Sequence, residues 1–312
     1  MNSLPQAANN VEEGHEYPVA GGSRMTPFEL LEPRSLREAA GLLDGAESRP
    51  VAGGTAVMLM MKMGVLSPAR LVSLRAVEQR YSGIAAGRDG GLRIGALATL
   101  SALERSNAVK SHAPVITRAL KTLSNVRVRN VATVGGHLAH ADPHLDLPPV
   151  LIALGASVTI VNPAGERTVP LDQLYAGYLE TTLARNELIA EVTVPAPAGR
   201  RAAYLKCTTR SADDWPALGV AVVLDADDGV VRGARIVISA ATDTPTRMTK
   251  TEAVLRGTRV DAATLARAGE AAATEAGVIG DSHGSAAYKK VLVRVYVARA
   301  IRAALADDAV TK

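Results

Sequence analysis

Apolar and polar residues recur with two different periods along this chain, and the changes of period predict its helices and strands. The segment Ser35-Leu-Arg-Glu38 predicts a capped helix that continues to about Leu43. Apolar residues three and four positions apart predict a longer helix over 114–123. Short apolar runs bounded by glycine or proline are typical of strands, and these are expected at 49–52, 70–74, 92–96, 156–161 and 188–194.

The second part of the chain has a different order of elements. Strand-like runs at 202–208, 217–224 and 231–239 predict an antiparallel meander, and helical patterns follow at 246–255, 261–275 and 284–306. A proline- and glycine-rich segment, Pro195–Gly199, lies between the two parts and is the best candidate for a domain boundary. Because the first part is not a regular series of βαβ units, the order argues against a Rossmann fold.

Helix signals allow three further interpretations. Thr55 is expected to cap a methionine-rich helix over 55–63, whose apolar stripe is expected to face the core. The segment Ser101–Glu104 repeats the capping-box pattern and predicts another helix start. The last predicted helix carries basic residues that are expected on a solvated face: Lys289, Lys290, Arg294, Arg299 and Arg302.

Composition narrows the class of function. Only 3% of residues are aromatic and the net charge of +4 is spread without a basic run, which argues against nucleic-acid binding. The single cysteine, Cys207, excludes an internal disulfide, a thiolate zinc site and an iron–sulfur cluster within this chain. No apolar run is long enough to span a bilayer, and residues 1–24 lack a signal pattern, so we expect a cytoplasmic protein with a flexible N-terminal extension.

Two glycine pairs are the strongest candidates for a ligand site. In Val51-Ala-Gly-Gly-Thr55 the glycines lie between an expected strand and helix, where the backbone can approach a ligand and present successive N–H groups to an anion. Taken alone, this motif is better explained as a plain Gly-Gly turn capped by Thr55. About 80 residues later, Thr133-Val-Gly-Gly-His137 offers a second such cradle within an expected loop over 129–149. Asp146, near its end, is interpreted as a helix N-cap.

The same loop supports a competing hypothesis, a zinc or iron site. Its nitrogen and oxygen ligands stand close together in the sequence: His137, His140, Asp142, His144 and Asp146. On a loop these side chains need not converge, so the metal hypothesis is the weaker of the two.

These motifs resemble the FAD-binding (medium) subunit of molybdenum hydroxylases, the xanthine dehydrogenase / aerobic carbon monoxide dehydrogenase family. The resemblance rests on Ala52–Thr55 and Thr133–Pro149, and it extends over about residues 25–307 through similar segments at 26–39, 187–195, 203–206 and 284–288. It implies an α/β (α+β) fold. A two-lobed PCMH-type FAD-binding domain would occupy 25–198, with lobes at about 25–80 and 81–198, and a smaller C-terminal α/β domain with an antiparallel sheet and helices would occupy 199–312.

The resemblance also implies roles for individual residues. The two glycine loops would hold the diphosphate of FAD, and Asp146 would face its sugar-phosphate side. Leu188 would pack near the adenine or ribose. Tyr204 could cover a flavin face, although an ordinary tyrosine of a sheet explains it equally well. Lys206 would lie near the pyrimidine edge of the isoalloxazine ring, where a cation stabilises reduced flavin. The implied cofactor-binding residues are Ala52, Gly53, Gly54, Thr55, Ala56, Val57, Thr133, Gly135, Gly136, His137, Asp146, Leu188, Lys206 and Tyr204.

Three positions qualify this set. Thr55 occupies the place where related flavin oxidases often carry a tethering histidine, so the FAD is expected to be non-covalent. Ala56 replaces a small polar residue that the family often has, and His137 replaces an asparagine. Neither replacement removes the backbone N–H groups on which the predicted cradles depend.

The function implied by the resemblance is electron transfer within a heteromeric enzyme. A large subunit would carry the molybdenum cofactor, a small subunit would carry [2Fe–2S] clusters, and the FAD of this chain would pass their electrons to an external acceptor, in a dimer of heterotrimers. Two alternatives remain open. One is a stand-alone flavin-dependent oxidoreductase with His112 or His137 as base, and the other is a metal-dependent hydrolase that uses the His/Asp loop.

Overall fold

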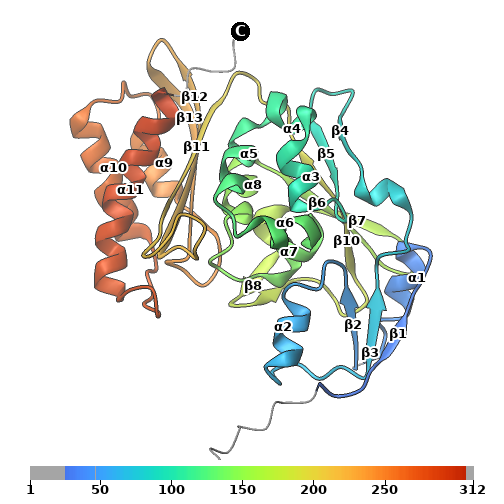
Figure 1. Cartoon of the computed structure of the whole chain (residues 1–312). Helices are drawn as coiled ribbons and strands as arrows, with labels where there is room; N and C mark the ends of the chain where they lie inside the picture. The colour runs from blue at the N-terminus through green and yellow to red at the C-terminus, as the bar shows by residue number, and fades with distance from the viewer. Residues whose placement is uncertain (1–24, 46, 307–312) are drawn as a thin grey trace, which may run out of the picture.

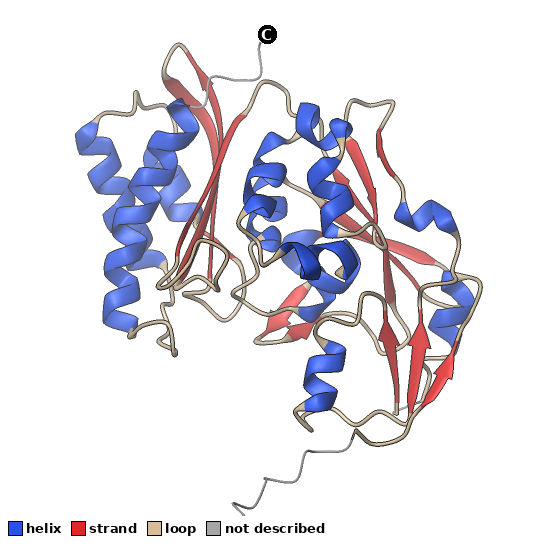
Figure 2. Cartoon of the chain, in the orientation of Figure 1, coloured by secondary structure: helices blue, strands red, loops and turns tan. Residues whose placement is uncertain are grey.

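The structure is a computed structural model that describes residues 25–45 and 47–306 (Figure 1). The N-terminal extension expected at 1–24 lies outside the described residues. Layers of helices and sheets alternate across the molecule (Figure 2). The C-terminal helices α9, α10 and α11 lie outermost and pack on the C-terminal sheet. A second group of helices follows that sheet, and a second sheet lies behind those helices. Within the described ranges, no helix combines the length and apolar character that crossing a membrane requires.

The first lobe is a small parallel sheet with two helices. Its strand order is β1-β3-β2, formed by β1 (Glu29–Leu31), β2 (Ser48–Val51) and β3 (Arg70–Ser73). Helix α1 (Leu36–Gly41) follows β1, and α2 (Val57–Lys62) follows β2. As predicted, the side chain of Ser35 caps α1 by accepting a hydrogen bond from the Glu38 N–H.

The second lobe is an antiparallel sheet in the order β4-β5-β10-β6-β7, covered by six helices. Its strands are β4 (Ile84–Ala86), β5 (Leu92–Gly95), β6 (Ser157–Val161), β7 (Glu166–Pro170) and β10 (Leu188–Val194). Its helices are α3 (Leu100–Arg105), α4 (Asn107–His112), α5 (Pro114–Lys121), α6 (Val126–Val131), α7 (Val134–His140) and α8 (Leu147–Leu154). The hairpin β8 (Tyr175–Gly177) and β9 (Glu180–Thr181) and the 3-10 turns Gln79–Ser82 and Leu171–Gln173 complete it.

The C-terminal part contains the predicted antiparallel meander followed by helices. The sheet is β11 (Arg201–Cys207), β12 (Leu218–Asp227), β13 (Val230–Ser239) and β14 (Thr246–Arg247), and the helices are α9 (Thr249–Leu255), α10 (Ala262–Glu275) and α11 (Ala286–Ala306). The unbroken apolar run of β12 reflects burial on both faces. Val220 and Val222 pack in the core beneath α9–α11, whereas Ala221 and Val223 pack in the core that contains α8.

Several predicted details are wrong. The cap of α3 is Thr99, whose side chain accepts from the Ala102 N–H, whereas Ser101 is buried and bonds to Asn130. Thr55 does not cap α2, which begins after Ala56 without a side-chain cap. The loop expected at 129–149 contains the second half of α6, all of α7 and the start of α8. Glycine and histidine are weak helix formers, so local propensity misses α7, which is held by its cap and its packing.

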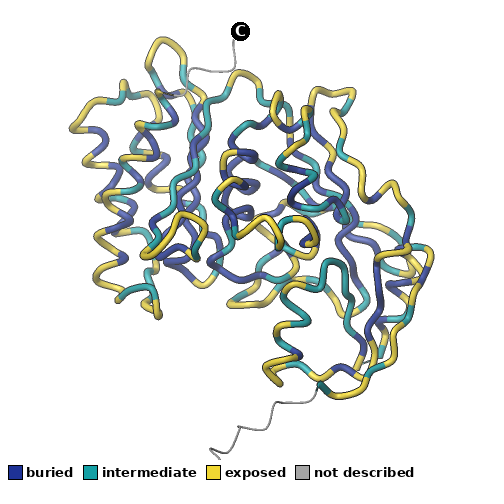
Figure 3. Tube along the Cα trace, viewed as in Figure 1, coloured by how far each residue is buried: buried dark blue, intermediate teal, exposed yellow. Residues whose placement is uncertain are grey.

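Two predictions of burial are also wrong. In the methionine-rich helix α2 only Met61 is fully buried, while Leu59 is 58% exposed and Met63, just after the helix, is 67% exposed. Figure 3 shows most of this segment in the colours of intermediate and exposed residues. This short helix stands at the edge of the first lobe, where no described element covers its outer face. Conversely, Lys289 of the basic C-terminal helix is completely buried, because Asp281 and the Ala240 carbonyl accept its hydrogen bonds.

Candidate functional site

The two glycine loops meet in space. A Cβ atom placed on Gly53 would lie 2.7 Å from the carbonyl carbon of Val131 and 2.8 Å from the Cα of Ala132. Only a residue without a side chain allows this approach, which brings the first loop against the residues just before Thr133. Gly54 has a φ of +72°, a conformation that glycine adopts without strain. Two segments about 80 residues apart in the sequence are therefore in direct backbone contact.

The first loop has unused hydrogen-bond donors. Within the described part of the chain, the backbone N–H groups from Gly53 to Val57 donate to no other group. The carbonyl of Gly54 is used, since it accepts from the Met58 N–H at 3.0 Å. A row of free N–H groups on a glycine turn is the arrangement that binds phosphate oxygens.

The second loop differs, because its amides already have partners. Gly135 N–H donates to the Ala96 carbonyl at 2.7 Å, and Gly136 N–H donates to the side chain of Thr133 at 3.2 Å. A Cβ on Gly135 would lie 2.7 Å from that of Ala96. Thr133 is thus the cap of α7, and Gly135 allows α7 to pack closely on the chain after β5. The second pair shapes the wall of the site and supplies fewer anion donors than expected.

A buried polar cluster lies where the C-terminal sheet meets α8. Lys206 Nζ, on β11, donates to Asp146 Oδ2 at 3.0 Å and to the carbonyls of Thr122 at 2.7 Å and Asp214 at 3.1 Å. Tyr204 Oη donates to Asp146 Oδ1 at 2.5 Å. The side chains of Lys206 and Asp146 are each 6% exposed, so the lysine is far from the solvated position that lysines usually take.

Burial dominates the electrostatics of this cluster. It raises the pKa of Asp146, although the charge of Lys206 and the hydrogen bond from Tyr204 act in the opposite direction. Burial and the neighbouring carboxylate both raise the pKa of Tyr204, which therefore keeps its proton. Asp146 stands at the first position before α8, but its side chain makes no capping hydrogen bond, because both oxygens are engaged by Tyr204 and Lys206.

His137 and Leu188 occupy different surroundings. The Nε2 atom of His137, on α7, is buried without a hydrogen-bond partner, and burial lowers the pKa of this ring to about 3. Such an orphaned polar atom beside the glycine loops is a group that a bound ligand can satisfy. Leu188, at the start of β10, is buried in the core that joins α1 to the second lobe.

The five residues of the metal hypothesis do not converge. Asp146 pairs with Lys206, whereas Asp142 pairs with His144. Among the described residues, one group has metal-ligand spacing, namely His144, Asp281 and His283, whose ligand atoms lie within 4.8 Å of one another. Lys289 Nζ already lies 2.5 Å from Asp281 within this group, so a cation is present there without a metal.

The sequence analysis missed Trp215, Asp281 and Lys289, which join His144 in one cluster. His144 and Asp281 are 137 residues apart, and no local spacing connects them. The one available signal is chemical: a lysine on the buried side of a long helix needs a negatively charged or carbonyl partner.

The fold and the site define a class of protein. Two apposed glycine loops, one with free N–H donors, lie in a two-lobed domain, and a second domain with an antiparallel sheet contributes Tyr204 and Lys206. This arrangement suits an extended cofactor with a diphosphate at one end of the site and a polar ring at the other.

Comparison with known proteins agrees with this class. Residues 26–197 match the family described as "FAD binding domain in molybdopterin dehydrogenase", and residues 203–304 match "CO dehydrogenase flavoprotein C-terminal domain". The chain is 33% identical to the nicotine 6-hydroxylase medium subunit of Paenarthrobacter nicotinovorans, with 89% of this chain and 97% of the relative covered. It is also 33% identical to the carbon monoxide dehydrogenase medium chain of Hydrogenophaga pseudoflava, with the same coverage.

The fold comparison leads to the same proteins. The solved structure of carbon monoxide dehydrogenase from Hydrogenophaga pseudoflava superposes with a TM-score of 0.87 and 33% identity, and the match covers 91% of this chain and 99% of that chain. The chain therefore belongs to the family of FAD-binding medium subunits of molybdenum hydroxylases. It is the flavoprotein subunit of an oxidoreductase.

Proposed function

We propose that FAD bound to this chain takes electrons from [2Fe–2S] clusters on a small partner subunit and passes them to an external acceptor. The clusters are reduced by a molybdenum-cofactor site on a large partner subunit, and the enzyme is a dimer of heterotrimers. The observation that carries the proposal is the contact of Gly53 with Val131, which joins two loops into one site beside free N–H donors. The relatives support the partners, because they are medium subunits of larger dehydrogenases and hydroxylases.

The residues of the chain bind and orient the cofactor. We assign the diphosphate to the segment Ala52–Val57, whose N–H groups are free from Gly53 to Val57. Gly135 and Gly136 form the opposite wall, and Thr133 fixes that wall by capping α7. His137 Nε2 is buried and unpaired, so a polar group of the cofactor can satisfy it. We keep Leu188 as the apolar residue nearest the adenine or ribose, a role consistent with its burial between the lobes.

The ring end of the cofactor is assigned to the Lys206 cluster. When bound, FAD supplies the reversible two-electron chemistry. Lys206 holds a positive charge at the pyrimidine edge of the ring and donates to Asp146 Oδ2 at 3.0 Å. Tyr204 keeps Asp146 in position by donating to its Oδ1 at 2.5 Å. A fixed cation at this edge stabilises the reduced form, whose negative charge develops there. Because Thr55 cannot form the histidine tether of related oxidases, the FAD is non-covalent in this proposal.

Two features disfavour the alternative functions. His137, one of the two bases considered for a stand-alone oxidoreductase, has a pKa of about 3 and so accepts protons poorly at neutral pH. The His/Asp loop residues needed by a metal-dependent hydrolase take separate partners within the chain.

Purification of the complex from its native host tests the proposal. The chain is expected to be yellow, to release FAD on denaturation, and to co-purify with one chain that carries molybdenum and one that carries iron and sulfide. Colourless protein, or stoichiometric zinc or iron in the isolated chain without flavin absorbance, would contradict it. Turnover of a small donor by the isolated flavoprotein at the rate of the complex would favour the stand-alone oxidoreductase instead.

Two further assignments belong to this proposal. We place the domain division at 25–198 and 199–312, with lobes meeting near residue 80, which is supported by the family matches at 26–197 and 203–304. We also place the protein in the cytoplasm, where a buried, unpaired Cys207 stays reduced.

A further inference from the structure

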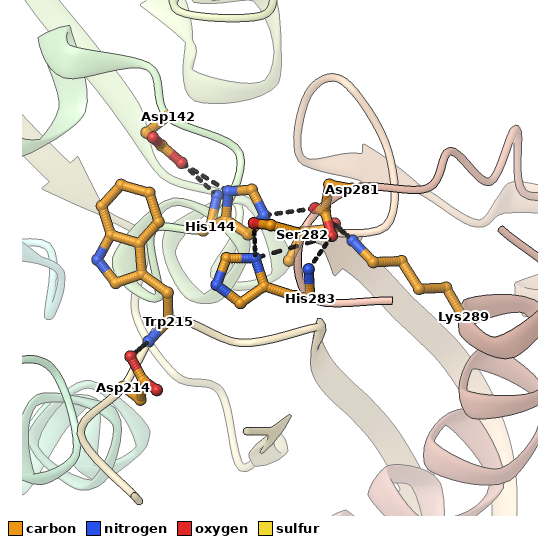
Figure 4. Close-up of polar contacts among 9 residues, drawn as sticks. Asp142, His144, Asp214, Trp215, Asp281, Ser282, His283 and Lys289 are labelled. Atoms are coloured by element: carbon orange, nitrogen blue, oxygen red, sulfur yellow. Dashed lines mark hydrogen bonds and ion pairs between the residues drawn. The ribbon is translucent and has the colours of Figure 1, made fainter. Parts of the chain in front are cut away.

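Four charged side chains form a line that crosses from the FAD-binding domain to the C-terminal domain (Figure 4). His144 Nδ1 lies 2.9 Å from Asp142 Oδ1, and His144 Nε2 lies 2.8 Å from Asp281 Oδ2. Lys289 Nζ lies 2.5 Å from the same oxygen of Asp281. Because each ring nitrogen of His144 faces a carboxylate oxygen, both nitrogens are donors and the ring is an imidazolium. The line thus alternates two negative and two positive charges.

The charges of this line support one another. Burial acts to lower the pKa of His144, but its hydrogen bonds to Asp142 and Asp281 outweigh burial, and the pKa is raised above 6.5. Burial acts to raise the pKa of Asp281, yet hydrogen bonds from Lys289 and His144 lower it to about 2. The line is therefore an ion-paired contact between the two domains.

His144 also carries an aromatic neighbour. The ring of Trp215 stacks on it (Figure 4), with centroids 5.4 Å apart and an angle of 18° between the planes. Trp215 is 46% exposed. The next residue back in the chain, Asp214, accepts the Trp215 backbone N–H on its carboxylate at 2.9 Å. Its carbonyl oxygen accepts a hydrogen bond from Lys206 at 3.1 Å.

Both members of the Lys206–Asp146 pair are therefore tied to His144. Asp146 lies two residues after His144 in the same turn before α8. Lys206 is held by a carbonyl adjacent to the indole that stacks on His144. We infer that His144 is a positioning residue, which locks the two domains together and fixes Lys206 and Asp146 relative to each other. Its consequence for FAD rests on the proposed function, in which this pair lies beside the flavin ring.

Titration of His144 controls this lock. Three charged or titratable groups face His144 directly, namely Asp142 from its own loop and Asp281 and His283 from the loop before α11. Two further groups act through these carboxylates: Lys289 of α11 is paired with Asp281, and His140 lies near Asp142. Because the folded-state pKa is raised, the stabilising effect is fully present below pH 6.5 and is lost as the pH rises through the folded value. Loss of the proton removes one of the two bonds to a carboxylate.

The fluorescence of Trp215 tests the inference, because it is the single tryptophan of the chain. A protonated imidazole stacked on an indole quenches its emission by accepting an electron. In the full chain we expect dim emission at low pH and a one-proton increase centred above pH 6.5, measured between about pH 5 and 9. His144→Gln keeps side-chain hydrogen bonding without a titrating ring, so the transition is expected to be lost and the emission bright throughout.

His283→Gln is the matched control. It removes the other imidazole of the cluster, whose ring is tilted by 41° against His144, and it is expected to retain the transition. Loss of the transition in His283→Gln with its retention in His144→Gln would overturn the inference. So would equal emission of the wild type and His144→Gln at the acidic end of the range. Stoichiometric zinc bound to the purified chain and dependent on His144 would also overturn it.

A second readout connects the lock to the cofactor. In the FAD-loaded chain, His144→Gln is expected to make the flavin midpoint potential more negative at acidic pH, and to leave it close to the wild-type value above the transition. If the fluorescence transition is present while the potential does not respond, His144 still locks the domains but Lys206 is not beside the ring, and the placement of FAD given above fails instead. An unchanged potential together with an absent fluorescence transition would reject the positioning role itself.

Discussion

The absence of a side chain at Gly53 is what lets the two loops touch. Replacing it with alanine places a methyl group against the backbone of Val131, which belongs to a helix and cannot move aside independently. We expect Gly53→Ala to lose about 1–3 kcal/mol of unfolding free energy, the range for overpacking, and to lose most bound FAD. The ratio of flavin to protein absorbance and a urea titration measure the two effects.

Gly41→Ala is the control for this substitution. A Cβ at Gly41 meets nothing within 4 Å, and the residue ends helix α1. It should therefore leave both the FAD content and the stability unchanged or slightly raised. Equal FAD content in Gly53→Ala and Gly41→Ala would contradict the role of the loop contact.

Lys206 allows a prediction with a defined pH dependence. Lys206→Met removes the partner of a buried carboxylate, and we expect a loss of about 3–5 kcal/mol of unfolding free energy at neutral pH. Burial already raises the pKa of Asp146, and without Lys206 it rises further. A raised folded-state pKa favours folding at low pH, so the deficit should shrink as the pH falls towards about 5.

Denaturation of Lys206→Met at several pH values checks this dependence. Lys290→Met, at an exposed position of α11, should stay within about 0.5 kcal/mol of the wild type at each pH. If the loss of unfolding free energy in Lys206→Met stayed constant or grew as the pH fell, the pH dependence would not come from protonation of Asp146.

At these residues, the sequence indicates which residue types belong to the candidate site better than it indicates which partners they contact. The glycine pairs are visible in the sequence, because glycine has few other uses between a strand and a helix. The roles of Asp146 and Lys206 beside the cofactor are implied by the family resemblance and stay predictions. The partners of those residues could not be predicted. Asp146 looks like a helix cap, but Tyr204 and Lys206, some 60 residues away, provide stronger hydrogen bonds than the helix end does.

At the scale of elements, period and composition predict the C-terminal sheet and helices well, because each buries a continuous apolar face. They fail in the second lobe, where α6 and α7 are short and rich in valine, glycine, asparagine and histidine, which have low helix propensity. They fail again at α2, whose methionine stripe resembles a core face. Periodicity indicates which residues share a face, but it does not indicate whether the same chain covers that face.

Helix α2 can be tested by comparing its two sides. Met61 is 3% exposed and Leu59 is 58% exposed. We expect Met61→Ala to cost about 2 kcal/mol or more, and Leu59→Ala to change the unfolding free energy of the isolated chain by less than about 0.5 kcal/mol. Chemical denaturation of both variants measures the difference. Equal losses would mean that the outer side of α2 is packed in solution.

At the scale of the whole molecule, one core belongs to both domains. Val223 and Val237 of the C-terminal sheet pack in the same cluster as Leu151 of α8 and Ile94 of the second lobe. Each domain therefore completes the interior of the other. Separate unfolding would expose this shared apolar surface to water, which disfavours a half-folded state.

The shared core predicts a single cooperative transition. We expect the emission of Trp215, which lies where the two domains meet, and the far-ultraviolet circular dichroism of the whole chain to change at the same denaturant concentration. Val237→Ala should lower both midpoints together, by about 2 kcal/mol in unfolding free energy. Val291→Ala, at a position 50% exposed on α11, should move neither. Midpoints that separate in Val237→Ala would show that the domains unfold independently.

The meeting of Gly53 with Val131 also has a consequence for biosynthesis. The ribosome releases the first loop long before it has made the backbone segment against which that loop is shaped. A nascent chain that ends after the first lobe thus contains only one of the two loops of the proposed cofactor site. FAD binding at these loops, as proposed above, has to wait until the helix containing Val131 has emerged and docked, so FAD cannot be the template on which the first lobe folds.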